Sequence, residues 1–197
     1  YGLEKEPGIV IEGDSSRMVY GYPTYCLPIL TLHSITEAIK ENNYYVLMPS
    51  AQGINISTTR DTLYTKSLMS SSSDSYAKLA GYDMTTTDKE EGDTDGAFIL
   101  SAIAIEYRDE EQTTANATQI VWFGSEYMLD ETVDAVVSGV NTDLFLNAVN
   151  WVTDREERSN IRTKSMMLQY LVVPTVDSTV WSVVVMVAIP LTVILIG

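Results

Sequence analysis

The sequence predicts a mixed α/β fold built on an open sheet, followed by one apolar C-terminal helix. Short runs of β-branched and aromatic residues alternate with helix-like segments over most of the chain. The last residues, 180–197, read VWSVVVMVAIPLTVILIG and contain no charged side chain, although the chain as a whole is strongly acidic. We therefore expect an acidic α/β domain over residues 1–176 and a separate apolar element over 177–197.

The charge balance excludes several classes of protein. The chain of 197 residues carries 12 Lys and Arg against 27 Asp and Glu, a formal net charge of −15. Such a charge repels phosphate backbones and anionic lipid, so nucleic-acid binding and a polybasic membrane contact are not expected. A single cysteine and a single histidine leave no disulfide framework and no Cys- or His-rich metal motif. We expect no metal and no cofactor.

The first half of the body contains two expected strands around one expected helix. Residues 9–11 form a short apolar run that ends at Gly13, which indicates a strand. Residues 34–37, Ser-Ile-Thr-Glu, match a capping box with Ser34 as N-cap and Glu37 at the third helical position, and the helix should end near residues 42–43. Residues 44–48, YYVLM, predict a buried strand.

The second half contains three more expected strands and a longer helix. Strands are predicted at 62–69, 97–107 and 119–123. A helix is predicted to start with Asn141 or Thr142 as its N-cap, because apolar residues follow at helical spacing. An acidic stretch at 90–96 resembles a calcium loop, but an EF-hand would need a glutamate where Ala102 stands. We interpret that stretch as a solvated turn.

The apolar tail predicts a membrane span over residues 180–197. At about 1.5 Å per residue the segment reaches about 27 Å, close to the thickness of the hydrocarbon core of a bilayer. Trp181 stands where an interfacial aromatic residue anchors the entering end, and membrane helices tolerate a kink such as Pro190. A buried core helix is the alternative, but no polar stripe runs along the segment.

Two arrangements could supply a nucleophile. Cys26 and His33 are seven residues apart and could act as nucleophile and base, although Cys26 lies in an extended segment rather than on a sharp strand-to-helix turn. Ser125 follows a strand and Gly124 but lacks the complete G-x-S-x-G pattern, and its only available base would be His33. We assign no catalytic residue.

A cluster of tyrosines is the candidate binding surface. Tyr20, Tyr22, Pro23 and Tyr25 form the pattern YxYPxY. Aromatic and proline side chains suit contacts with a peptide, a glycan or a partner protein, and a half-buried edge strand would show the same pattern.

Several strings, in this order and spacing, resemble one family. The strings are GYP at 21–23, Pro28, HSIT at 33–36, ENN at 41–43, VLMP at 46–49, AQGI at 51–54, SDSYAK at 73–78, EGDTDG at 91–96, IVWFGS at 120–125 and NTDLFLNAVNW at 141–151. Together they look like the auxiliary membrane subunit of gliding-motility-type ABC transporters, over its C-terminal half.

The resemblance implies a non-enzymatic accessory subunit at the cell membrane. Members of the family place an α/β region resembling flavodoxin and class I amidotransferase folds outside the cytoplasm, between an N-terminal and a C-terminal membrane helix. They accompany an ABC permease and an ATP-binding subunit, and they have no established catalysis. This chain starts with Tyr1 and lacks the first helix and a Walker motif, so ATP binding is expected in a partner. A cell-surface hydrolase or amidotransferase-like enzyme, a surface glycan- or peptide-binding module and a structural tether remain as alternatives.

Overall fold

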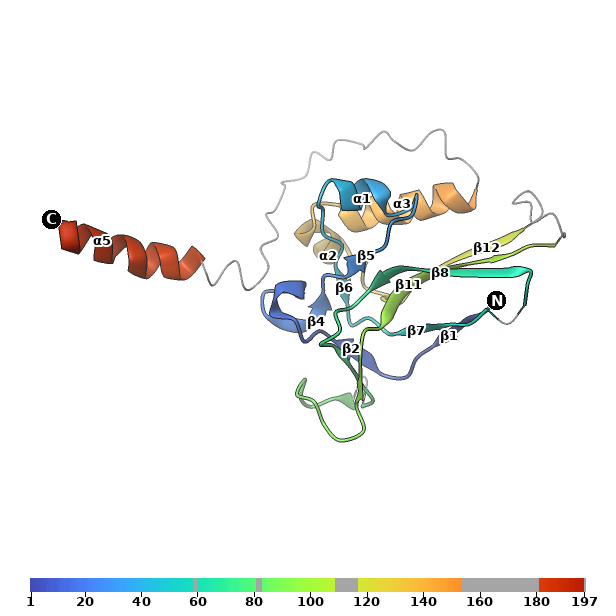
Figure 1. The fold of residues 1–197 in the computed structure, drawn as a ribbon, viewed down its shortest axis with the longest axis horizontal. Coiled ribbons are helices and arrows are strands. Elements are labelled where there is room, and N and C mark those ends of the chain that lie inside the picture. The colour runs from blue at the N-terminus through green and yellow to red at the C-terminus, as the bar shows by residue number, and fades with distance from the viewer. Residues whose placement is uncertain (59, 81–82, 109–116, 154–180, 197) are drawn as a thin grey trace.

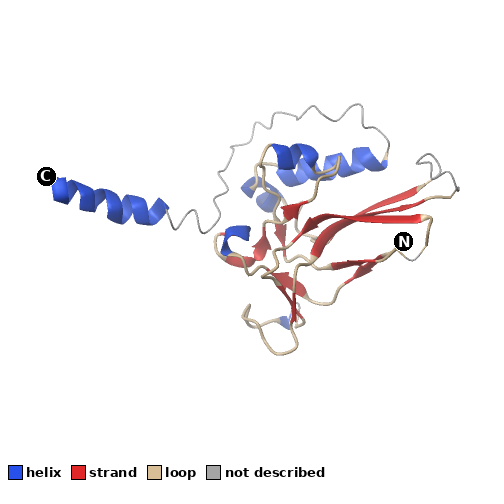
Figure 2. Cartoon of the chain, in the orientation of Figure 1, coloured by secondary structure: helices blue, strands red, loops and turns tan. Residues whose placement is uncertain are grey.

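The body of the chain is a mixed α/β structure, as the sequence predicts. The computed structural model describes residues 1–58, 60–80, 83–108, 117–153 and 181–196. Within these ranges strands outnumber helices, and all described strand pairs are antiparallel. Figures 1 and 2 show the strands gathered in the body and a helix at the C-terminus.

A four-stranded sheet forms the centre of the body. Its order is β12 (Thr118–Phe123), β11 (Ile99–Glu106), β8 (Leu63–Ser70) and β5 (Ile29–Leu30). The strands predicted at 62–69, 97–107 and 119–123 are therefore confirmed. In β11 every residue from Leu100 to Ile105 is buried, on both faces, which matches its nearly continuous apolar sequence.

Three small sheets complete the strand structure. One pairs β1 (Leu3–Lys5) with β7 (Ile54–Ile56). The second has the order β10 (Thr94–Asp95), β9 (Tyr76–Lys78), β2 (Ile9–Ile11), which confirms the strand predicted at 9–11. The third has the order β3 (Met18–Val19), β4 (Tyr22–Cys26), β6 (Met48–Pro49). The strand predicted at 44–48 is wrong in extent, because only its end is paired in β6.

Different elements cover the two faces of the four-stranded sheet. The helices α1 (Glu37–Glu41), α2 (Glu131–Val136) and α3 (Val140–Val152) lie on one side, and the β1–β7 pair lies on the other (Figure 1). Helix α3 contacts β12, and β7 contacts β11. The hydrophobic core between the helices and the sheet includes Ile35, Ile39, Leu47, Leu68, Leu100, Ile103, Val133, Leu144 and Ala148.

The helix starts differ from the predicted ones. The capping box at 34–37 does not form, because α1 begins at Glu37 with Thr36 in the N-cap position. The Thr36 hydroxyl instead donates to the carbonyl oxygen of Thr31 at 2.5 Å. Helix α2 was not predicted; the Asp130 side chain caps it by accepting from the backbone N–H of Thr132 at 2.9 Å.

Asn141 does not cap α3 but joins it to two loops. The helix begins at Val140, and Gly139 with φ 83° holds the N-cap position. The fully buried Asn141 amide accepts from the Leu47 N–H at 3.0 Å and donates to the carbonyl oxygens of Leu47 at 2.8 Å and Met128 at 2.7 Å. A buried amide with three such bonds fixes the position of α3 relative to the two loops that contain Leu47 and Met128.

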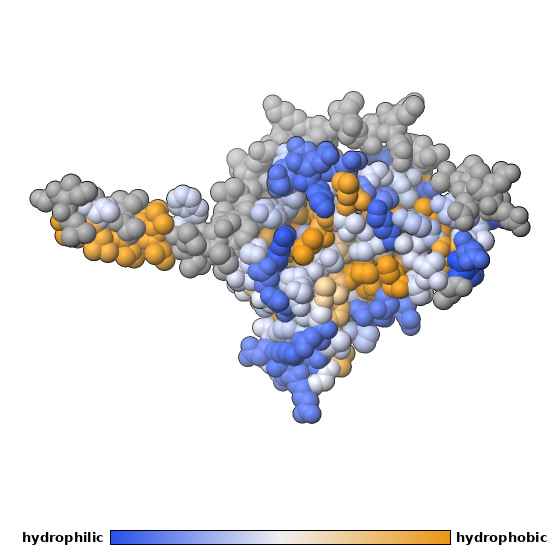
Figure 3. All heavy atoms as spheres, in the orientation of Figure 1, coloured by the Kyte–Doolittle hydropathy of each residue, from blue (hydrophilic) through white to orange (hydrophobic). Residues whose placement is uncertain are grey.

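The C-terminal segment is helical over residues 181–196. It contains a π-helical stretch, Val184–Ala188, followed by α5 (Ile189–Ile196). Within the part of the chain that the structure describes, no helix combines the length and the apolar character needed to cross a membrane. Residues 180 and 197 of the expected span, and residues 177–179 of the expected C-terminal element, lie outside the described ranges. Figure 3 shows the hydrophobic colouring of this helix, whose exposed apolar side chains include Trp181, Val183, Val185, Met186, Val187, Leu191 and Ile194.

The Asn141 bridge predicts a large loss of stability on substitution. Asn141→Leu keeps the volume but leaves the N–H and C=O of Leu47 and the C=O of Met128 without a partner. We expect the free energy of unfolding to fall by about 3 kcal/mol, measured by urea denaturation. Asn150→Leu, on the half-exposed part of the same helix, should change it by less than about 0.5 kcal/mol. Equal effects of the two changes would contradict the bridging role.

Candidate functional site

The predicted tyrosine cluster forms an exposed hairpin. Strands β3 and β4 are joined by Tyr20 and Gly21, and both residues have positive φ, 55° and 73°. This is the backbone of a type I′ turn, whose first central position favours Asn, Asp or Gly over tyrosine. The Tyr20 side chain is 71% exposed and Tyr22 is 60% exposed. A bulky residue held in the left-handed region at an exposed tip is compatible with a binding role.

The structure brings the members of the cluster together only in part. The rings of Tyr22 and Tyr25 lie 5.9 Å apart, with an angle of 49° between their planes. Pro23 and Tyr25 are half-buried, and the carbonyl oxygen of Pro23 accepts from the Glu12 N–H at 2.8 Å. Tyr20 and Tyr22 thus offer aromatic surface to solvent, while Pro23 and Tyr25 hold the hairpin to the body. The cluster stays a candidate binding surface.

Cys26 lies in a buried hydrogen-bond network. Its side chain is 1% exposed, and its thiol donates to a carboxylate oxygen of Glu12 at 3.5 Å. Burial, and then the neighbouring Glu12 charge, raise the pKa of the Cys26 thiol well above its usual value. The fraction of nucleophilic thiolate at neutral pH is therefore small.

The Glu12 carboxylate organises the surrounding turns. It is buried and accepts from the backbone N–H groups of Asp14 at 3.0 Å and Ser72 at 3.1 Å. The hydroxyls of Ser72 and Ser75 and the thiol of Cys26 donate to it as well. Every one of these contacts satisfies the buried carboxylate, which identifies the network as structural.

His33 has other partners than Cys26. Its Nδ1 accepts from the backbone N–H of Ile35 at 3.2 Å, and its ring meets the Trp151 ring edge-on with centroids 5.4 Å apart. Burial, and then the charge of Lys66, lower the pKa of His33. The imidazole is therefore largely neutral at pH 7, and it supports the start of α1 rather than activating a thiol.

Ser125 also has a structural contact. It is 5% exposed, and its hydroxyl donates to the carbonyl oxygen of Pro49 at 2.5 Å. The three residues that could have supplied a nucleophile and a base are thus each bonded to a different group: Cys26 to Glu12, His33 to the backbone of Ile35, and Ser125 to the backbone of Pro49.

A polar loop projects from the body between β9 and β10. The buried Lys78 ammonium donates to the carbonyl oxygen of Asp88 at 2.7 Å and to Asp93 at 3.1 Å, and it also pairs with Glu90. Burial alone lowers the pKa of Lys78, but the bonds to Glu90 and Asp93 outweigh it and raise that pKa. Figure 3 shows the loop as a hydrophilic projection. Among the described residues no group of His, Cys, Asp or Glu side chains is placed to hold a metal ion.

Strand β12 borders a site that contains one of the residues singled out in the sequence, Ser125. A pocket of about 390 Å³, called here the larger pocket, opens between β12 and the start of α3. The rings of Phe123 and Phe145 lie 6.5 Å apart in its wall. Its lining is mostly apolar: Ile120, Val121, Trp122, Phe123, Ser125, Glu126, Met128, Leu129 and Phe145.

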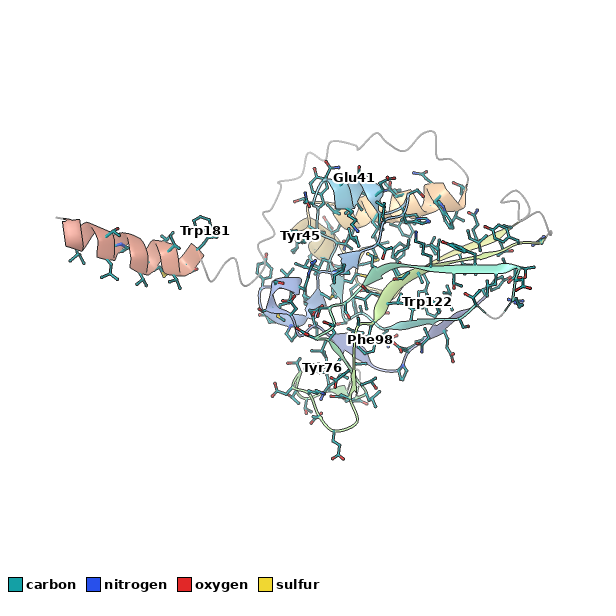
Figure 4. All side chains as sticks on the ribbon, viewed as in Figure 1. Glu41, Tyr45, Tyr76, Phe98, Trp122 and Trp181 are labelled. Carbon is teal, nitrogen blue, oxygen red and sulfur yellow. The ribbon has the colours of Figure 1, made fainter. Side chains whose placement is uncertain are left out.

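A second pocket lies at the same end of β12. This smaller pocket, of about 180 Å³, is lined in part by β1 and β7, and it shares Trp122, Phe123 and Glu126 with the larger one. Figure 4 shows Trp122 between the sheet and β7. Phe123 packs against the hydrophobic core, and its ring lies beside that of Phe145 in α3. The two pockets therefore meet at the end of β12, where both are lined by Trp122 and Phe123. The remaining residues of the smaller pocket are Lys5, Ser50, Gln52, Gly53, Ile54 and Gly124.

The sequence contained one usable signal for this site. Residues 120–123, IVWF, are all apolar and follow the uncharged Gln119, a pattern that predicted a strand. The position of that strand at the border of the sheet depends on the pairing order, and local sequence does not encode that order.

Comparisons with known proteins add no family to this description. No protein-family model, no curated protein and no solved structure matches the chain. By its fold and its pockets, the body of the chain is an acidic mixed α/β domain with an apolar strand at the border of its main sheet.

The buried, high-pKa thiol predicts that native Cys26 is unreactive. We expect no labelling of the folded chain by iodoacetamide at pH 7 and complete labelling in urea, monitored by intact mass. The reason is that both access and thiolate formation require local unfolding. Rapid labelling of the native chain would instead restore Cys26 as a candidate nucleophile.

Proposed function

We propose that the chain is a non-enzymatic, membrane-anchored accessory subunit of an ABC transport system. In this proposal the acidic α/β domain, residues 1–176, lies outside the cytoplasm, and residues 177–197 anchor it. An ABC permease and an ATP-binding subunit are its partners. The resemblance in sequence supports the proposal, and one of its strings, NTDLFLNAVNW at 141–151, forms most of α3.

The observation that carries the proposal is the uncharged C-terminal helix. Most of its described side chains are apolar and exposed; Met186 and Ile194 are each 76% exposed. Leaving such side chains in water costs about 25 cal/mol for each Å² of apolar surface. A lipid environment or a hydrophobic partner removes that cost, and Trp181 at the start of the helix suits the membrane interface.

The contacts of the candidate nucleophiles support a non-enzymatic role. Cys26 is buried with a raised pKa, Ser125 is bonded to a backbone carbonyl, and His33 is held by a backbone N–H and a tryptophan ring. Catalysis needs a nucleophile within hydrogen-bond reach of its base. A cell-surface hydrolase or amidotransferase-like enzyme is therefore the weaker candidate.

The finer architecture belongs to the proposal as well. The family fold resembles flavodoxin and class I amidotransferases, which are built on parallel strands. The described strand pairs of this chain are antiparallel. A flavodoxin-like arrangement therefore has no support from the described strand pairs and stays part of the proposal.

The tyrosine hairpin favours a second candidate function. Tyr20 at a positive φ and the exposed ring of Tyr22 would suit a surface module that binds a peptide or a glycan. Under this hypothesis the hairpin is the contact surface and the C-terminal helix only a tether.

The accessory role predicts co-purification with two other subunits. The tagged chain, in its native membrane and solubilised in mild detergent, should retain an ABC permease and an ATP-binding subunit, identified by mass spectrometry. A chain truncated after residue 176 should lose most of both, because the membrane anchor no longer concentrates the partners. Recovery of neither subunit by the full chain would contradict the proposal.

A further inference from the structure

Strand β12 has an open hydrogen-bonding edge. In the described part of the chain it pairs with β11 alone, from Thr118 to Phe123, without a register shift. At the end of the strand, the Gly124 N–H donates to the carbonyl oxygen of Leu100 in the direction of β11, at 2.8 Å. The chain then turns, and the Gly124 carbonyl oxygen accepts from the Gln52 N–H at 2.8 Å.

Alternation along the strand identifies the groups on the open edge. In an antiparallel ladder, every second residue directs its N–H and C=O toward the same neighbour. Since Gly124 donates toward β11, Trp122 and Ile120 do so too, and the hydroxyl of Ser101 on β11 reaches the Trp122 carbonyl oxygen at 2.9 Å. The N–H and C=O groups of Gln119, Val121 and Phe123 therefore point away from β11, toward the open edge.

This edge lacks the usual protection against strand pairing. Exposed edge strands commonly carry Lys, Pro or a bulge that prevents association. Residues 118–123 contain no charged residue and no proline, although the chain has a net charge of −15. An unprotected edge of this kind is what strand addition requires.

The two pockets lie where the side chains of a strand added beside β12 would point. Successive side chains of a strand project to opposite faces of its sheet. The larger pocket reaches Phe145 of α3, whereas the smaller one reaches Lys5 of β1 and Ile54 of β7. A strand lying beside β12 would thus place alternate side chains toward each pocket, which is the basis of specificity in β-strand addition.

We propose that an extended segment of another protein joins this sheet as a fifth strand beside β12. The segment carries apolar residues at every second position and at least one Lys or Arg. The apolar side chains fill the larger pocket, whose walls include Phe123, Phe145 and Leu129. The basic side chain meets Glu126, which is exposed and belongs to both pockets.

Charge favours such a partner over a second copy of the chain. Two copies would each bring a net charge of −15 to the contact. A second β12 would also bring no cation to Glu126, because it has no basic residue. The proposal rests on the geometry of the edge and does not depend on which complex the chain joins.

The test uses two synthetic octapeptides of equal composition and the full chain in mild detergent. One peptide alternates Lys with Val or Phe, and the other has the same residues in scrambled order without alternation. Binding is measured by fluorescence anisotropy. We expect the alternating peptide to bind at least about tenfold more tightly than the scrambled one, because charge alone does not distinguish them.

Variants of the chain separate backbone pairing from charge attraction. Val121→Pro removes an N–H that faces the open edge and leaves the ladder to β11 intact, so it should weaken binding about tenfold or more while far-UV circular dichroism stays unchanged. Gln119→Pro tests the same edge if the first variant does not fold. Glu126→Gln should weaken binding about threefold to tenfold. Glu131→Gln, a matched loss of charge on the exposed start of α2, should not change it.

Three results would overturn the inference. The first is no binding of the alternating peptide at about 1 mM. The second is equal binding of the two peptides together with an equal loss of affinity in Glu126→Gln and Glu131→Gln. This result would indicate unspecific charge attraction. The third is a dimer in sedimentation that Val121→Pro dissociates, because a second copy would then occupy the edge. None of these results bears on co-purification with transporter subunits, so failure here is distinguishable from failure of the proposed function.

Discussion

Burial of β11 on both faces is the constraint on which the rest of the structure depends. Residues from Leu100 to Ile105 are withdrawn from water, so the sheet needs a layer on each side. The helices supply one layer, and β7, which contacts β11, belongs to the other. With both faces covered, the sheet can extend only at its borders, and β12 is one border strand. The proposed interface follows from this arrangement.

Buried polar side chains fix the loops around that sheet. Asn141 joins α3 to Leu47 and Met128, Glu12 gathers the turns that contain Ser72 and Cys26, and Lys78 holds the polar loop. Each of these groups has several partners, which is how a buried polar group avoids a desolvation cost. The same network buries the Cys26 thiol and raises its pKa. These three polar side chains therefore position the loops around the sheet.

Local sequence predicted the elements better than their arrangement. The strands at 9–11, 62–69, 97–107 and 119–123 follow from short-range apolar patterns, and the structure confirms them. The predicted caps failed for two different reasons. Residues 34–36 form a turn in which the N–H groups of Thr36 and Glu37 donate to the carbonyl oxygen of His33, so α1 starts after the expected cap Ser34. The Asn141 amide instead bonds to Leu47 and Met128 in the core. The tyrosine cluster could be predicted as a surface, since its pattern is local. The open edge of β12 could not, because it depends on the pairing of strands far apart in the sequence.

Amide hydrogen exchange of β12 in the isolated chain tests the central claim most directly. If the sheet ends at β12, the amides of Gln119, Val121 and Phe123 face the open edge and should exchange quickly, while those of Ile120 and Trp122, bonded to β11, should be protected. The measurement requires residue-level exchange by NMR on the ¹⁵N-labelled chain. Fast exchange at odd positions and slow exchange at even positions is the predicted result. Uniform protection along β12 would show that its second edge is already occupied, and it would contradict the account.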